Sequence, residues 1–211
     1  MNELFRPILK AKIVPVIKLT DIDQVTGLGN ALTKAGLPIA EITLRSPVAL
    51  ECIKAMKDEF PQMLIGAGTV TTTDQADAAI EAGAVFIVTP GFNPTVVDHC
   101  ISKGYPIIPG VTSPSLVEWA LERGLTRLKF FPAEASGGAN YLKNLAPVYP
   151  EASFMPTGGV NKNNIKEYLA LPNVYACGGS WIVKTALLEA HDFAEVERLT
   201  REVLDSIGGN S

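Results

Sequence analysis

The sequence predicts an α/β fold in which residues 1–211 form one domain, a (β/α)8 (TIM) barrel with an extra N-terminal helix. Two observations predict it. Short apolar runs rich in β-branched residues recur eight times along the chain, and segments with a helical pattern separate them. Eight parallel strands covered by helices fit a closed barrel better than an open doubly wound sheet. No GxGxxG motif follows the first run, which counts against a Rossmann domain.

The carboxyl ends of the predicted strands follow one another at intervals of roughly 20 to 27 residues, about the length of one βα unit. In chain order, the predicted strands are the runs 13–18, 39–45, 64–69, 85–90, 106–111, 127–132, 153–159 and 174–180. We expect four of the intervening helices to end at a glycine in the left-handed conformation. These glycines are Gly36, Gly83, Gly104 and Gly124.

Three helix boundaries have further signals. The first long helix is expected to have Thr20 or Asp21 as its N-cap, and the helix after the third strand is expected to begin at a threonine with an acidic first turn. The segment 192–207 predicts a C-terminal helix.

Composition limits the class of protein. Of the 211 residues, 47% are hydrophobic and 19% are charged, as in ordinary globular proteins, and the net charge is −4 without long runs of either sign. This argues against a nucleic-acid or anionic-membrane partner, although a local basic pocket for a small anion remains possible. The three cysteines form no CxxC pair, and no segment reads as a signal peptide or membrane span, so we expect a cytoplasmic protein.

Polar residues in two predicted strands are expected to point into the barrel. Side chains of a barrel strand alternate between the interior and the helix layer. In the second run the even-numbered positions are apolar, so Glu41, Thr43 and Arg45 should face inward. The same alternation in the sixth run points Lys129 inward. A carboxylate, a guanidinium and an amine would then converge.

Lys129 stands within an apolar run, where burial of an unpaired charge is costly. Two interpretations stay open. Lys129 and Glu41 form a structural ion pair, or Lys129 is a nucleophilic amine and Glu41 its acid/base partner. Burial and the cation of Arg45 favour a neutral amine, whereas an ionised Glu41 favours the charged form, so the sequence leaves the balance open.

Glycine-rich stretches close the last two runs, as PTGG (156–159) and CGGS (177–180). Loops at these places in a barrel commonly bind phosphate through backbone N–H groups. Tight turns would explain one such stretch, but two at these ends favour a phosphate site, with the hydroxyl of Ser180 added. A third stretch, GAGT (66–69), offers Thr69 and backbone donors to a carboxylate beside Arg45.

The remaining candidates are expected to be structural. His99 and His191 are isolated in sequence and are interpreted as surface or packing residues, so no metal site is expected. Cys177 is interpreted as a small core residue, and Trp119 and Trp181 as packing residues.

Seven motifs occur in order along nearly the whole chain, and together they are highly specific. They are EITLR (41–45), GAGTV (66–70), PG (90–91), PGV (109–111), KFFPAE (129–134), PTGGV (156–160) and GGSW (178–181). This ordered set resembles the KHG/KDPG aldolases, bacterial class I aldolases of the Entner–Doudoroff pathway that cleave 2-dehydro-3-deoxy-6-phosphogluconate (KDPG).

The resemblance implies a role for each matching position. Lys129 matches the Schiff-base lysine and Glu41 the general acid/base. Arg45 and Thr69 match the family residues that hold the pyruvyl carboxylate. Pro90 and Phe131 match the walls of the family's pyruvate pocket. Residues that fall where the family binds phosphate are Gly158, Gly159, Gly179 and Ser180, and Thr157 is expected to be a further substrate-binding residue.

The resemblance also implies a phosphorylated 2-keto acid substrate, no metal or other cofactor, a homotrimer, and cleavage of 4-hydroxy-2-oxoglutarate (KHG) to pyruvate and glyoxylate. Alternatives remain open: an aldolase for the galactonate epimer, an isomerase or epimerase that uses no covalent lysine, or a sugar-phosphate sensor without turnover.

Overall fold

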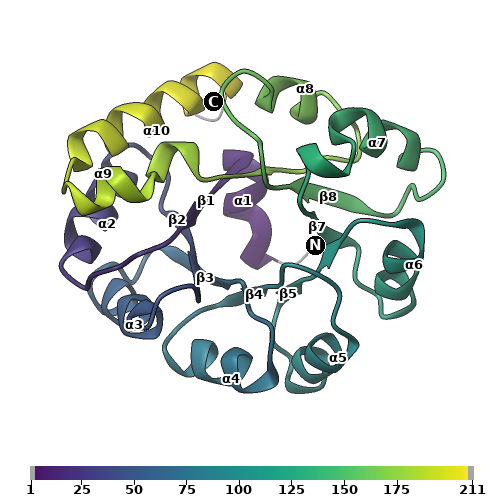
Figure 1. The fold of residues 1–211 in the computed structure, drawn as a ribbon, viewed down its shortest axis with the longest axis horizontal. Coiled ribbons are helices and arrows are strands. Elements are labelled where there is room, and N and C mark those ends of the chain that lie inside the picture. The colour runs from purple at the N-terminus through teal and green to yellow at the C-terminus, as the bar shows by residue number, and fades with distance from the viewer. Residues whose placement is uncertain (1–2, 209–211) are drawn as a thin grey trace.

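The computed structural model describes residues 3–208, and Figure 1 shows strands at the centre with helices arranged around them. The strands are β1 (Ile13–Ile17), β2 (Ile39–Thr43), β3 (Leu64–Gly68), β4 (Phe86–Val88), β5 (Ile107–Ile108), β6 (Gly110–Val111), β7 (Arg127–Phe130), β8 (Ser153–Pro156) and β9 (Cys177–Gly179).

Helices follow most of the strands, as the alternating pattern predicts. They are α1 (Arg6–Ala11), α2 (Gln24–Lys34), α3 (Ala49–Glu59), α4 (Thr73–Glu81), α5 (Pro94–Lys103), α6 (Pro114–Glu122), α7 (Gly138–Leu145), α8 (Ile165–Leu169), α9 (Thr185–Glu189) and α10 (Phe193–Ile207), with short 3-10 turns η1 (Glu3–Phe5), η2 (Glu134–Ser136) and η3 (Trp181–Val183). Within residues 3–208, no helix is both long enough and apolar enough to span a membrane.

The strands pair in parallel, which confirms the predicted α/β class. They form a curled six-stranded sheet in the order β5-β4-β3-β2-β1-β9 and a three-stranded sheet in the order β6-β7-β8. Two isolated parallel bridges, Phe154 with Val174 and Thr157 with Gly178, link β8 to the β9 segment. The prediction of one continuous eight-stranded sheet is therefore met only in part.

Pro109 divides the fifth predicted strand into β5 and β6. Proline has no N–H to donate to a ladder. Its carbonyl still accepts from Lys129 N at 2.9 Å, while Gly110 N donates to the Thr89 hydroxyl at 3.2 Å instead of to a strand. The fifth predicted strand therefore pairs with one sheet before Pro109, as β5, and with the other sheet after it, as β6.

Local signals placed most helix ends correctly. Gly36, Gly83, Gly104 and Gly124 all have φ between +71° and +105°. Thr72 caps α4 in a capping box with Gln75, as expected for this threonine-rich start.

The predicted cap of α2 is met only in part. The helix begins at Gln24, and its N-cap, Asp23, makes no side-chain capping bond. Asp21 Oδ1 accepts from Asp23 N at 2.9 Å in the turn that leads into the helix, and Gln24 Oε1 accepts from Thr20 N and Asp21 N, which precede the helix.

The N-terminal helix covers one end of the strands, and Figure 1 shows α1 lying across the middle of the ring. Phe5, just before α1, meets the ring of Phe86 edge-on at 6.4 Å between centroids. The guanidinium of Arg127, at the start of β7, lies 5.2 Å from the Phe5 ring centroid. These contacts occur at the amino-terminal side of the strands, so the opposite ends are left open for a site.

We predict that the three thiols of the folded protein react very slowly with iodoacetamide at pH 8. Cys52, Cys100 and Cys177 are fully buried. Burial raises the pKa of Cys52 and Cys100 to about 11 and raises that of Cys177 further. Because only the thiolate reacts, alkylation of Cys52 and Cys100 should slow by about a hundredfold, even before burial hinders access. Mass spectrometry should find three modified cysteines after unfolding in guanidinium; equal labelling of the native protein would contradict the prediction.

Candidate active site

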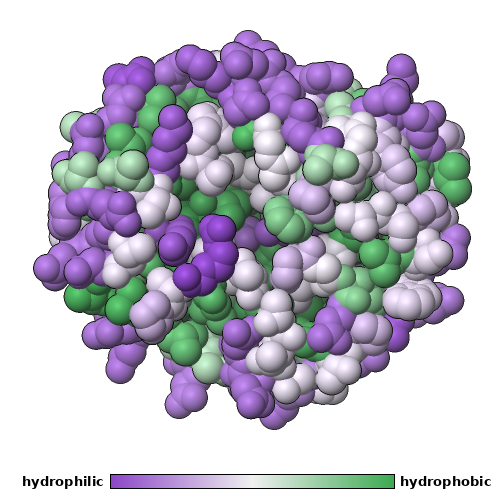
Figure 2. Space-filling model, viewed as in Figure 1, coloured by the Kyte–Doolittle hydropathy of each residue, from purple (hydrophilic) through white to green (hydrophobic). Residues whose placement is uncertain are grey.

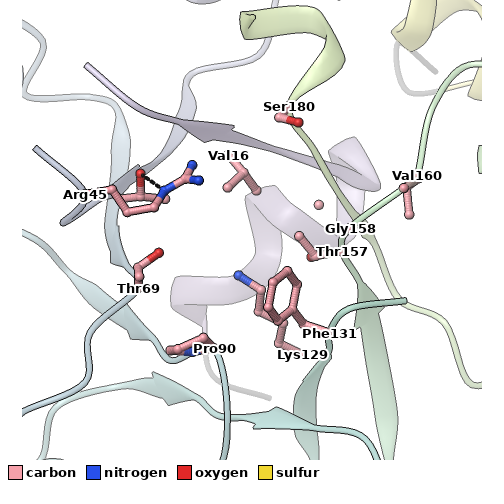
Figure 3. Close-up of a pocket in the computed structure, with 13 residues that line it drawn as sticks. Val16, Arg45, Thr69, Pro90, Lys129, Phe131, Thr157, Gly158, Val160 and Ser180 are labelled. Atoms are coloured by element: carbon pink, nitrogen blue, oxygen red, sulfur yellow. Dashed lines mark hydrogen bonds between the residues drawn. The ribbon is translucent and has the colours of Figure 1, made fainter. Parts of the chain in front are cut away.

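A pocket of about 280 Å³ opens where the carboxyl ends of the strands meet. Figure 2 shows this face hollowed near its middle, with apolar surface deep in the hollow and strongly hydrophilic surface beside it. Residues from several strand ends line the pocket: Val16, Thr43, Arg45, Thr69, Pro90, Lys129, Phe131, Thr157, Gly158, Gly159, Val160, Gly178 and Ser180. Figure 3 shows Arg45 and Thr69 on one side and Lys129 and Phe131 on the other.

The central feature is a buried ion pair. Lys129 Nζ lies 3.1 Å from Glu41 Oε1, and the two side chains are 5% and 0% exposed. The other oxygen of Glu41, Oε2, is buried and has no hydrogen-bond partner among the described residues. Lys129 Nζ also lies 5.5 Å from the centroid of the Phe131 ring, while the amine faces the pocket (Figure 3). The site therefore holds an amine next to a carboxylate that has one oxygen free to exchange protons.

Gly68 on β3 makes room for Glu41. A Cβ added at Gly68 would lie 2.2 Å from Glu41 Oε1 and 2.8 Å from its Cγ. In the parallel register, Glu41 lies beside Gly66 and Thr43 beside Gly68. The Glu41 side chain therefore extends along the neighbouring strand, two residues beyond its paired position, to reach Gly68. Gly68, the second glycine of GAGT, thus leaves space for the Glu41 carboxylate on the neighbouring strand.

Arg45 reaches the pocket from just beyond β2. Its Nε donates to Thr43 Oγ1 at 3.0 Å, and the Thr43 hydroxyl donates to Ile17 O at 2.7 Å. This chain of contacts holds the guanidinium in place (Figure 3). With Arg45 and Lys129 against the single carboxylate of Glu41, the site has an excess of positive charge, which favours anionic ligands.

Thr69 adopts a backbone conformation that β-branched residues rarely accept. Its φ is +59°, in the left-handed region. Such strain costs on the order of 1–3 kcal/mol and concentrates at functional sites. It directs the Thr69 side chain into the pocket opposite Lys129 (Figure 3).

The loop after β8 presents backbone N–H groups to the pocket. Three of its carbonyls are engaged elsewhere: Thr157 O accepts from Ala133 N at 2.8 Å, Gly158 O from Glu134 N at 3.1 Å, and Gly159 O from the side-chain amide of Asn161 at 2.9 Å. The N–H groups of Gly159 and Val160 donate to no described residue. An anion could accept from such donors.

The structure brings nearly all the predicted site residues together. Nine of the eleven line the pocket, and Glu41 lies behind Lys129. Gly179 does not line the pocket; its neighbour Gly178 does, because β9 turns alternate residues inward and a Cβ at Gly178 would lie 2.2 Å from Thr157 Oγ1. A Cβ at Gly179 would instead meet the ring of Trp181.

The sequence reasoning missed four lining residues: Val16, Thr43, Val160 and Gly178. Strand parity marked Thr43 as inward-facing, but β9 is buried throughout and has no polar alternation that would select Gly178 over Gly179. Val16 lies in β1, where every residue is buried, so no polar alternation distinguishes it.

The other candidates lie outside the pocket. His99 pairs with Asp77 at 2.8 Å, and the His191 ring meets Phe193 edge-on. Cys177 is a buried strand residue, as predicted. Trp119 on α6 packs edge-on against Phe92 at 6.1 Å between ring centroids but is 44% exposed, so its prediction as a packing residue is met only in part. Among residues 3–208 no group of three His, Cys, Asp or Glu side chains is arranged to hold a metal.

This combination defines a class of protein: an α/β enzyme whose buried lysine and carboxylate meet a small anionic substrate at the carboxyl ends of parallel strands. Comparison with known proteins identifies the family. The family model described as KDPG and KHG aldolase matches residues 6–199. The chain belongs to this family.

Relatives cover almost the full length. The chain is 46% identical to the 2-dehydro-3-deoxy-phosphogluconate aldolase of Haemophilus influenzae, over 98% of this chain and 97% of that protein. It resembles the solved KDPG aldolase of Legionella pneumophila with pyruvate captured as a covalent carbinolamine (TM-score 0.90, 38% identity, 93% and 97% covered). It equally resembles the 2-keto-3-deoxy-6-phosphogluconate aldolase of Zymomonas mobilis with 3-phosphoglycerate (TM-score 0.90, 38% identity, 96% and 95% covered).

We predict that Gly68→Ala displaces Glu41 and lowers the rate of KDPG cleavage by about a hundredfold, the size expected for a catalytic group moved by about 1 Å. The measurement is steady-state cleavage with pyruvate detected by a coupled assay. Gly91→Ala is the matched control, since a Cβ there would meet nothing within 4 Å. Equal rates in the two variants would show that Gly68 does not set the position of the carboxylate.

Proposed function

We propose that this protein is a class I aldolase that cleaves KDPG to pyruvate and glyceraldehyde 3-phosphate through a Schiff base on Lys129, and that it also cleaves KHG to pyruvate and glyoxylate. The observation that carries the proposal is the contact of 3.1 Å between Lys129 Nζ and Glu41 Oε1 at the floor of a cationic pocket. The alternative of a purely structural ion pair gives no reason for the amine to face an open pocket.

The reaction begins at the amine. Neutral Lys129 attacks the C2 carbonyl carbon of the substrate and forms a carbinolamine, which loses water to give an iminium ion. The iminium accepts electrons from the neighbouring carbon–carbon bond. Transfer of the ammonium proton to Glu41 would free the nucleophile, and the short contact between the two groups supports this step.

Glu41 then carries the protons. It removes the proton of the C4 hydroxyl, directly or through a water, and the C3–C4 bond breaks with its electron pair passing to the iminium. Glyceraldehyde 3-phosphate leaves and an enamine remains. Protonation of the enamine carbon by Glu41 and hydrolysis of the resulting iminium release pyruvate and restore the amine. Oε2 of Glu41 has no hydrogen-bond partner among the described residues, which supports this role, because no other group competes for its proton.

The two ends of the substrate would be held by opposite sides of the pocket. We assign the pyruvyl carboxylate to Arg45 and Thr69, which lie together across the pocket from the glycine loop (Figure 3). Pro90 and Phe131 would form the walls of the pyruvate site. Binding energy from the remote end would then orient the carbonyl for attack.

We assign the phosphate to the loops after β8 and β9. The proposed group is Thr157, Gly158, Gly159, Gly179 and Ser180, to which the lining supports adding Gly178. The unengaged N–H groups of Gly159 and Val160 support this assignment. Gly179 would contribute only through its backbone.

We further propose that the two sheets act as one closed (β/α)8 barrel and that residues 1–211 are one domain with the extra N-terminal helix α1. The bridges between β8 and β9, and the shared strand at Pro109, support closure. One hydrophobic core cluster extends from Phe5 to Leu204 and supports a single domain. Residues 1–2 and 209–211 lie outside the described part.

Assembly and location are proposed on the family resemblance and on composition. We propose a homotrimer in the cytoplasm, which sedimentation of the purified protein and cell fractionation would test. The galactonate epimer remains the rival substrate, and cleavage rates measured on both C4 epimers would decide between them.

We predict that incubation with pyruvate followed by borohydride adds one reduced pyruvate to Lys129, as seen by intact mass and peptide mapping. Lys129→Arg keeps a cation next to Glu41 but cannot form the imine, so it should neither trap pyruvate nor turn over substrate. Lys143→Arg is the matched control, because Lys143 is an exposed lysine on α7. A folded wild-type sample without an adduct would contradict the Schiff-base mechanism and exclude the aldolase in favour of a non-covalent isomerase.

We predict that Glu41→Gln lowers kcat by roughly 10²–10⁴-fold, the usual contribution of a general acid/base. The amide can still accept from Lys129, so the fold should persist, as thermal unfolding would check. Glu118→Gln, on the exposed face of α6, provides the same substitution outside the pocket. A kcat equal to that of the control would remove Glu41 from the proton transfers.

A further inference from the structure

A hydrogen bond outside the pocket joins the segments on either side of the glycine loop. Tyr168 on α8 is fully buried, and its hydroxyl donates to Glu134 Oε1. Burial, and then the hydrogen bond to the Glu134 carboxylate, raise the pKa of Tyr168 well above its ordinary value, so the hydroxyl keeps its proton and remains a donor. Neither residue lines the pocket.

Glu134 is in direct contact with the glycine loop. Its backbone N–H donates to Gly158 O at 3.1 Å. Its side chain packs over Gly159, where an added Cβ would lie 2.4 Å from Glu134 Cγ and 2.7 Å from its Cβ. Gly159 has φ of +84°, so the loop passes beneath Glu134 in a conformation that suits glycine. The Cβ and Cγ atoms of Glu134 therefore pack directly against the glycine loop and support it.

The second support comes from the start of the helix that carries Tyr168. Asn164, the N-cap of α8, donates its side-chain amide to Gly159 O at 3.2 Å and accepts from Asn161 N at 2.8 Å. Tyr168 follows one turn later and donates its N–H to Asn164 O at 3.3 Å. The loop is thus held between Glu134 on one side and the beginning of α8 on the other, and the Tyr168 hydroxyl connects the two supports.

We propose that the Tyr168–Glu134 hydrogen bond is a positioning device that fixes the glycine loop and thereby sets affinity for the phosphate end of the substrate, without acting on the chemistry at Lys129. This inference rests on the proposed function for its substrate. Backbone donors bind an oxyanion well only when they are held in place before it arrives, because ordering a loose loop on binding consumes part of the binding energy. Lys129 is positioned by β7 and Glu41, on the other side of Phe131.

The test compares Tyr168→Phe with Tyr149→Phe. Tyr149 also donates its hydroxyl to a glutamate, Glu118, at 2.8 Å, but far from the pocket lining. Two quantities are measured for each variant: the dissociation constant for 3-phosphoglycerate by calorimetry, and the rate of borohydride trapping with pyruvate, which has no phosphate. Tyr168→Phe should weaken 3-phosphoglycerate about tenfold, the size expected for loss of a hydrogen bond to a charged group, with trapping unchanged. In turnover, KM should rise for KDPG and stay constant for KHG.

A conservative variant separates positioning from general loss of structure. Glu134→Gln keeps an oxygen that accepts from Tyr168 and should retain most of the affinity, whereas Glu134→Ala, which also removes the side chain packed over Gly159, should lose at least as much affinity as Tyr168→Phe. An unchanged dissociation constant in Tyr168→Phe, an equal loss of binding and trapping, or a wild type that does not bind 3-phosphoglycerate would each overturn the inference. If wild type binds 3-phosphoglycerate, Tyr168→Phe weakens it, and no pyruvate adduct forms at Lys129, the positioning role stands and the proposed aldolase mechanism fails.

Discussion

The contact between Lys129 and Glu41 is the interaction on which the rest of the site depends. Both side chains are buried, and a buried charge left without its partner costs about 3–5 kcal/mol, so neither can be altered independently. Space for the pair comes from a neighbouring strand, where Gly68 has no side chain to occupy the position of the carboxylate. A stable fold could be built more simply from apolar residues at these positions. The pair is retained where it faces an open pocket, which is the arrangement an amine nucleophile requires.

Around this pair the pocket divides into two ends with different means of binding anions. Arg45 is a full charge held by Thr43, and Thr69 is held in a strained backbone conformation beside it. The opposite end offers backbone N–H groups of a glycine loop whose carbonyls are tied to Ala133, Glu134 and Asn161. Charge and strain are therefore concentrated on the side of Arg45 and Thr69, while the opposite side offers backbone donors. A 2-keto acid with a phosphate at its far end matches both ends of the pocket. Relatives of the chain in this family are named as aldolases for such a compound.

Much of the fold and site could be predicted because the relevant signals are local. Alternation along one strand placed Glu41, Thr43 and Arg45 on one face, and glycines at positive φ marked four helix ends. Where prediction failed, a competing contact had decided the outcome. The helix α2 begins only at Gln24, after a turn in which the Gln24 side chain accepts from Thr20 N and Asp21 N, and Pro109 interrupted the fifth strand because it cannot donate a hydrogen bond. Trp119, predicted as a packing residue, is partly exposed because it lies on the outer side of α6.

The sequence by itself determined the alternating α/β pattern, the inward parity of the charged residues, and the family, because these depend on residue order and on short-range backbone preferences. Only the tertiary structure decided which residues meet across long separations. Lys129 and Glu41 are 88 positions apart, and Tyr168 and Glu134 are 34 apart, so their contacts exist only because parallel strands and the helix after β8 bring them together. The choice of Gly178 over Gly179 as a pocket residue likewise depends on how β9 is rotated against β8, which no local pattern specifies.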